Sequence, residues 1–291
     1  MHAHVIEALS DQLQEAFSEC DQFRIFLLPV EATHPRLEEP EKETNPTDDE
    51  PNQWSPRFGR ISREELDEDI RESSKTDPIF LIMVVLATIV ACVGLIKDSP
   101  AIIIGAMVIA PLLGPNTALA FGTTLGDTKL IRSSIRSNLI GLGLAIAIAI
   151  LFGFFLADTS DLNNEFASRT VVDLGDILLA LASGAAGAIA FTSGAPSTIV
   201  GVMVAVALLP PTAASGMLAG AGAWKEALAA LTLATTNIVC INLSATGIFL
   251  LQGIRPNDWY DKDRAKSATI RALTLWTSVL VALGLLIFFA W

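Results

Sequence analysis

The chain has 291 residues, of which 52% are hydrophobic, and its formal net charge at pH 7 is −12. So high an apolar fraction excludes an ordinary soluble domain of this length and indicates a membrane protein. The first 78 residues hold twenty acidic and eight basic residues and so carry the whole −12, while the remainder has eleven of each sign. A polyanionic arm excludes nucleic acid as a partner, because nucleic-acid binding needs basic patches.

The N-terminal arm is predicted to be short and soluble. Residues 1–30 have the pattern of a small helix-strand unit, with the strand over residues 23–30. Residues 31–60 are rich in Glu, Pro and Asp, which predicts an acidic disordered linker. The start of the chain lacks a basic region followed by a cleavable apolar stretch, so no signal peptide is expected.

Residues 61–77 are predicted to form an amphipathic acidic helix. Ser62 and Glu65 have the spacing of a capping box, in which each side chain binds a backbone N–H of the first helical turn. This helix leads directly into the first apolar segment.

Seven apolar segments follow, each near or above the roughly 20 residues that span a bilayer. They predict an all-α polytopic membrane helix bundle that sits in the lipid bilayer. The segments are 79–96, 100–125, 138–157, 175–193, 197–221, 226–251 and 270–290.

The first six segments form two copies of one unit. When residues 99–137 are moved forward by 96 positions, Pro100 falls on Pro196 and Pro115 falls on Pro211. The same offset superimposes the flanking segments without a gap, which indicates a duplication. The predicted membrane part therefore consists of two three-helix repeats and a seventh helix, namely residues 78–157, 174–252 and 268–291. Because each repeat crosses three times, the second copy enters from the opposite side, and the repeat is inverted.

Basic residues predict the orientation. With the N-terminus in the cytoplasm and the C-terminus outside, the inner connections collect most of the Lys and Arg residues, as the positive-inside rule requires. A multi-pass protein of the inner membrane is expected. In a competing interpretation, segments two and five are re-entrant hairpins and the repeat is parallel, which fits the basic residues less well.

Two proline motifs predict broken helices. Proline removes a backbone donor and clashes with the preceding turn, and freed backbone groups cannot face lipid. Breaks at 111–116 and at 208–212 are therefore expected to meet near the midplane. There, the polar residues after each break would cap a half-helix whose N-terminus attracts a small anion or a zwitterion, although Na⁺ held by carbonyls stays an alternative. The predicted substrate-binding set is Asn116, Thr117, Thr212 and Asn237, with Gly114, Pro115, Pro210 and Pro211 shaping the backbone.

Other polar residues in the spans, Asn138 and Asn242 among them, are interpreted as helix-to-helix hydrogen-bonding groups. No charged residue or histidine falls well inside a span, which disfavours proton coupling through a central acid. The three cysteines have no close spacing and the three histidines lie in the arm, so no metal site, cofactor or enzymatic activity is expected.

The string Ile104-Gly-Ala-Met-Val-Ile-Ala-Pro-Leu-Leu-Gly-Pro-Asn116, with the stretch that starts at Arg60, resembles the family of domain of unknown function 389. The resemblance covers about residues 60–250 and implies a prokaryotic membrane protein. The chain departs from many members by its short soluble arm. The resemblance implies no substrate and no functional residues.

These observations favour an inner-membrane transporter whose central site lies between two repeats. One alternative is an oligomeric ion channel in which the small-residue faces of segments four and five join protomers. Another is a non-transporting scaffold or sensor whose acidic arm binds a basic partner. A homo-oligomer and a small-molecule or ion substrate are the expected partners.

Overall fold

The computed structural model describes residues 63–156, 163–194 and 197–254, with scattered positions near both ends, namely 12–13, 16, 274, 276–278, 280–282 and 284. The acidic linker and most of the predicted helix-strand unit and of the seventh helix lie outside this part of the chain. The scattered positions described within residues 268–291 are helical.

The described residues form helices and short connections, without a strand among them. Four of the described helices are long and apolar enough to cross a membrane, or five if the bent pair α4–α5 is one span, which confirms an all-helical bundle of membrane type. The helices are α2 (Arg63–Ser73), α3 (Pro78–Ile96), α4 (Pro100–Ile109), α5 (Leu113–Leu125), α6 (Thr128–Leu156), α7 (Asn164–Ala167), α8 (Leu174–Thr192), α9 (Ser197–Gly220) and α10 (Trp224–Leu251).

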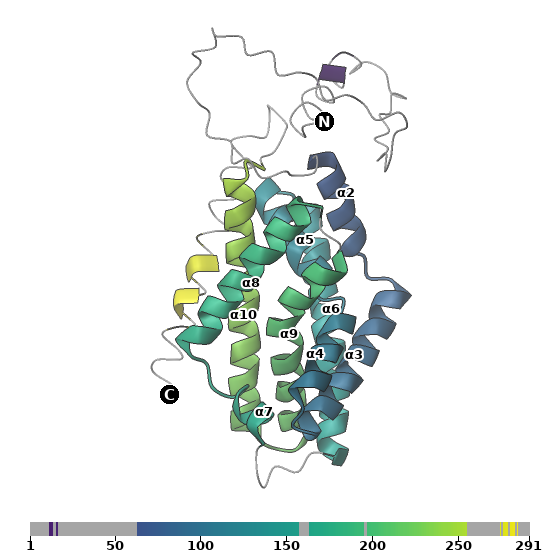
Figure 1. Cartoon of the computed structure of the whole chain (residues 1–291), viewed down its shortest axis with the longest axis vertical. Helices are drawn as coiled ribbons and strands as arrows, with labels where there is room; N and C mark the ends of the chain where they lie inside the picture. Colours follow the sequence, from purple (N-terminus) through teal and green to yellow (C-terminus); the bar gives the residue numbers. More distant parts are fainter. Residues whose placement is uncertain are drawn as a thin grey trace.

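The helices run along a common long axis between two ends (Figure 1). At the α2 end, α2 and the start of α3 adjoin the start of α6, where the hydroxyls of Thr76 and Ser137 lie 2.6 Å apart. At the α7 end, the connection after α6 binds the end of α3, because the amide of Asn163 donates to the Leu95 carbonyl at 2.7 Å. Helices α3 and α6 therefore both run from the α2 end to the α7 end.

Helices α4 and α5 together carry the chain back. Helix α4 begins at the α7 end beside α3, and α5 ends at the turn before α6, at the α2 end. The two axes are bent by 58°. A bend of that size fits a broken span or a re-entrant loop, and the chain leaves the pair at the opposite end of the bundle from where it entered.

The second half of the bundle runs the other way. Helix α9 ends at the α7 end against α6, where a Cβ on Gly220 would meet the Ile150 backbone and one on Gly153 would meet the Met217 backbone. Helix α10 then returns to the α2 end and packs Phe249 edge-on against Phe121 of α5. Because these glycines let the backbones of α6 and α9 touch, the small-residue pattern in α9 serves packing between these two helices.

The outer surface of the bundle is apolar at the helix faces that point away from α5 and α9. Large side chains there are exposed, as on a surface made for lipid, including Ile82 in α3, Leu139 and Phe154 in α6, Leu178 in α8 and Leu228 in α10. Between Leu113 and Thr124, by contrast, every residue of α5 is buried. The polar side chains that could act on a solute therefore lie inside the bundle.

Candidate functional site

The break between α4 and α5 is made by Pro111. Ala110 before it is extended, with φ −69° and ψ 120°, as a residue preceding proline prefers to be. Helix α5 restarts at Leu113, so Pro115 occupies the third helical position, where its missing N–H has no intrahelical partner to lose. The predicted break in segment two is confirmed, and a single proline accounts for it.

Asn116 does not cap the half-helix that follows the break. It lies one turn inside α5, and no side chain caps the start of that helix. Its amide nitrogen donates instead to the Leu112 carbonyl, one turn back, at 2.9 Å. The expectation that Asn116 and Thr117 cap this helix is therefore wrong, because the N-cap position is Leu112, four residues before Asn116.

Asn116 is the middle member of a buried row of three amides, which we name the asparagine chain (Asn116, Asn138 and Asn242). The Asn242 amide of α10 donates to the Asn116 oxygen at 3.2 Å, and the Asn116 amide donates to the Asn138 oxygen of α6 at 2.9 Å. All three side chains are at most 7% exposed. The asparagine chain therefore joins helices from both halves of the bundle.

The two ends of the asparagine chain are chemically different. The Asn138 amide nitrogen is buried and has no hydrogen-bond partner, and neither has the Asn242 side-chain oxygen. One end thus offers free N–H donors and the other a free acceptor. An unpaired buried polar group costs about 1–3 kcal/mol, so such groups generally bind a water, an ion or a solute.

Helix α9 is continuous through its proline pair. It runs unbroken from Ser197 to Gly220 with Pro210 and Pro211 inside, so the predicted break in segment five is wrong. Pro211 cannot donate to the carbonyl of Ala207, four residues before it. The Asn237 amide of α10 donates to that carbonyl at 2.8 Å, which replaces the lost backbone bond.

Thr212 also has a local role and not a capping one. Its hydroxyl donates to the Leu208 carbonyl within α9 at 2.7 Å. Among the described residues, no hydrogen bond links Thr212 to the asparagine chain. The structure thus brings Asn116 together with Asn138 and Asn242, and not with its repeat counterpart in α9.

The remaining residues of the predicted set shape the backbone around the break. Pro115 and Thr117 are buried in the first turns of α5. Gly114 lies against the last residue of α2, because a Cβ at this position would overlap the Ser73 carbonyl. Asn237, whose oxygen is also buried and unpaired, adds a further free acceptor on α10.

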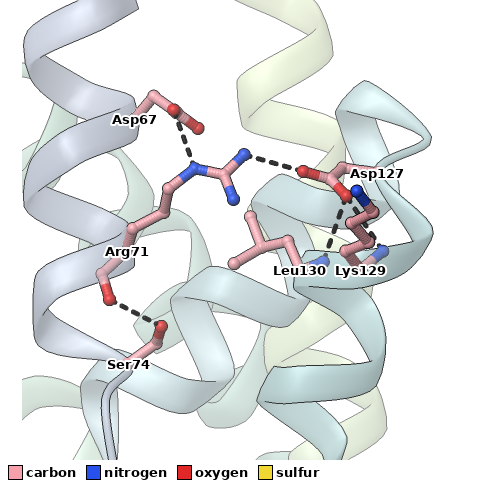
Figure 2. A network of polar contacts seen from close by, with 6 residues as sticks. All are labelled: Asp67, Arg71, Ser74, Asp127, Lys129 and Leu130. Carbon is pink, nitrogen blue, oxygen red and sulfur yellow. Dashed lines mark hydrogen bonds and ion pairs between the residues drawn. The ribbon is translucent and has the colours of Figure 1, made fainter.

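Helix α2 is tied to the turn between α5 and α6 by Arg71 (Figure 2). The Arg71 guanidinium donates to Asp67 at 2.8 Å and to Asp127 at 2.7 Å. Burial alone would raise the pKa of the Asp127 carboxyl, but the hydrogen bonds from Arg71 and from the Leu130 N–H hold that pKa below its usual value. Asp127 therefore stays charged and keeps its bond to Arg71 at neutral pH.

Asn138 and Asn242 are the site residues that the predicted set omits. Both are polar residues in apolar segments, but their partner Asn116 is 22 and 126 positions away along the chain. The available signal was the rarity of amides inside spans, which marks them as hydrogen-bonded without saying to what.

Comparison with known proteins finds similarity without an assigned activity. The model of the family described as domain of unknown function (DUF389) matches residues 107–243. An uncharacterized protein of Methanocaldococcus jannaschii is 37% identical over 286 residues, which cover 97% of this chain and 84% of that protein. No solved structure matches the chain.

Proposed function

Starting from the premise that this chain belongs to the DUF389 family, we propose that it is an inner-membrane transporter for a small anion or zwitterion. The solute binds inside the bundle at the asparagine chain. The observation that carries this proposal is a fully buried row of amides whose two ends lack partners.

The chemistry of the two ends favours a zwitterion over a simple anion. Free N–H donors at Asn138 suit a carboxylate or another anion, while the free oxygens of Asn242 and Asn237 suit an ammonium group. In the described spans, charged residues occur only in the first nine residues of α6 and in the first turn of α8 and of α10, and none belongs to the asparagine chain. The site therefore suits a solute that carries both an anionic acceptor and a cationic donor, or a compact ion.

The place of the site beside a broken helix agrees with a carrier. Asn116 lies one turn after the break between α4 and α5, and Asn138 follows Ser137, which contacts Ser74 and Thr76 just before α3, so the site lies toward the α2 end of the bundle. Transporters commonly build their sites at a discontinuous helix. One break is enough here, since irregular backbone needs only to be buried in protein.

We further propose that the two halves of the bundle are inverted repeats. The unit α3–α6 starts at the α2 end and the unit α8–α10 starts at the α7 end, which supports this relationship. Arg71, Lys129, Arg132 and Arg136 belong to the α2 end, so the positive-inside rule places that end in the cytoplasm and the C-terminus outside. A homo-oligomeric assembly is part of the same proposal.

The test is solute flux in proteoliposomes that hold the full chain. Radiolabelled glycine and chloride serve as the zwitterionic and anionic probes. We expect uptake of at least one probe above that of protein-free liposomes, and loss of it in Asn116→Leu, which keeps the branched shape and the number of side-chain heavy atoms and removes the amide. The matched control is Thr235→Ala, because Thr235 is exposed on α10 and its hydroxyl donates to the Leu231 carbonyl of its own helix.

Three results would contradict the proposal or replace it. Flux that survives Asn116→Leu at the wild-type rate refutes the site. If neither probe enters faster than into protein-free liposomes, transport of glycine and of chloride is refuted, and the hypothesis of a non-transporting scaffold remains. Single-channel currents far above carrier rates would replace the carrier with the channel alternative.

A further inference from the structure

Helix α2 and the residues after it lie over the parts of α5 and α6 that adjoin the asparagine chain. Its last residue lies on the first turn of α5, where the Ser73 carbonyl occupies the space that a Gly114 side chain would need. The residues after it cover α6, because the Ser137 hydroxyl donates to the Ser74 carbonyl at 3.1 Å and lies 2.6 Å from the Thr76 hydroxyl.

Polar groups continue inward from this contact. Ser137 is adjacent to Asn138, whose free amide nitrogen is one end of the asparagine chain. Ser134, one turn earlier on α6, is also fully buried. A polar stripe on α6 thus leads from beneath the α2 end of the bundle to the proposed solute site.

The contacts that hold α2 on the bundle can be broken while α3 stays folded. Leu66 and Ile70 bury its apolar face, and Arg71 forms an ion pair with Asp127 that is 2.7 Å long. The connection to α3, residues 74–77, is non-helical. Helix α3 has its own cap, because Asp77 accepts from the Phe80 N–H, so α2 can move without unwinding α3.

We propose that α2 is a lid over the cytoplasmic entrance to the asparagine chain, with the pair Arg71–Asp127 as its latch. In the structure the lid is closed. Opening swings α2 together with residues 74–76 about Asp77, at the start of α3, and uncovers Gly114, Ser137 and the polar stripe behind them. The proposal rests on the proposed function, since it regulates access to that same site.

The test measures how fast a thiol placed under the lid reacts. In the full chain with Cys20, Cys92 and Cys240 changed to Ala, Ser137→Cys reports access for a charged methanethiosulfonate in detergent. We expect modification about tenfold faster or more in Arg71→Ala and in Asp127→Asn, the factor expected for loss of a charge-assisted hydrogen bond. Gly114→Ala should give the same acceleration by pushing α2 away, and it keeps the ion pair.

Two controls separate lid opening from other effects. Arg132→Ala removes an exposed positive charge at the same end and should leave the rate unchanged. In a parallel set, Ser215→Cys reports from a buried position at the α7 end and should stay slow in every variant. Equal acceleration at both reporters would mean general loosening and would overturn the lid.

The lid and the transporter can fail separately. If no variant accelerates modification at position 137 while flux still depends on Asn116, the lid is wrong and the transporter stands. If the modification rate responds to Arg71→Ala but no probe is transported, the lid stands as a moving element and the proposed function is wrong.

Discussion

The α4–α5 span and helix α9 occupy equivalent places in the two halves of the chain, yet one is bent by 58° and the other is continuous. At the offset of 96, Pro115 corresponds to Pro211, whereas Pro111 corresponds to Ala207. The shared proline does not break either helix. The comparison teaches that the effect of a proline on a membrane helix depends on whether another group donates a hydrogen bond to the carbonyl that the proline leaves free.

The two helices resolve that problem in different ways. In α5, Pro115 is so close to the helix start that the N–H it lacks would have no intrahelical acceptor. In α9, the carbonyl that Pro211 leaves free is bound by Asn237 from α10. In the α4–α5 span, the extended conformation of Ala110 before Pro111 ends the first helix altogether.

The largest expected effect comes from placing the breaking proline in α9. Ala207→Pro removes an interior N–H and adds a clash with the preceding turn, which costs about 3 kcal/mol or more. Ala207 is also buried, so the helix has little room to bend. We expect the melting temperature in detergent to fall sharply. A variant that melts like wild type would show that α9 tolerates a break, against this account.

A smaller loss is expected from Asn237→Leu. The variant leaves the Ala207 carbonyl without a donor, at a cost of about 1–3 kcal/mol. Adding Pro211→Ala restores a backbone N–H at position 211, so the double variant should recover most of the stability. Denaturant midpoints of the four proteins in this cycle give the coupling. Additive losses would mean that Asn237 does not compensate for Pro211.

The converse change, Pro111→Ala, should alter stability by less than about 1 kcal/mol, because removing a proline acts mainly on the unfolded chain. Its effect is on shape. With an N–H restored at position 111, the bend between α4 and α5 should decrease from 58°. Spin-label distances between the two helix ends measure the change. An unchanged distance would assign the bend to packing around α5 and not to Pro111.

The smallest expected effect is a pH dependence of the docking of α2. It concerns only the half of the chain with the broken helix, since α2 packs on α5. The pKa of Asp127 is lowered in the folded protein, so its bond to Arg71 stabilises docked α2 above the ordinary aspartate pKa of about 3.9. This contribution disappears as the pH falls through the lower, folded pKa. Hydrogen exchange in α2, corrected for its intrinsic pH dependence, should rise below pH 4 in wild type. Asp127→Asn should show fast exchange at every pH.

Much of the fold was predictable from local patterns. Apolar segments located α3, α8, α9 and α10 to within two residues at each end. Helix α6 begins ten residues earlier than predicted, at Thr128, because its first turns carry exposed basic residues beside buried Leu130 and Ser134. The short α7 was missed since it depends on Asp98, a distant residue whose carboxylate accepts from the Glu165 N–H.

The candidate site was less predictable because its partners are remote in sequence. Asn116 was identified from the break beside it, but its bonds to Asn138 and Asn242 require the folded bundle. Asn237 was predicted to bind a solute, but its amide donates to the Ala207 carbonyl of α9, 30 positions earlier in the chain. The local sequence shows which backbone carbonyl loses its donor, and only the fold shows which side chain donates to that carbonyl instead.

An experimental map of the membrane region at a resolution that shows ordered water tests the central claim most directly. Asn138 and Asn242 are buried with one unpaired end each. We predict ordered density for water, an ion or a solute within hydrogen-bond distance of the Asn138 amide nitrogen and of the Asn242 oxygen. A map in which both atoms bond to other protein groups, with no density beside them, would contradict the proposed site.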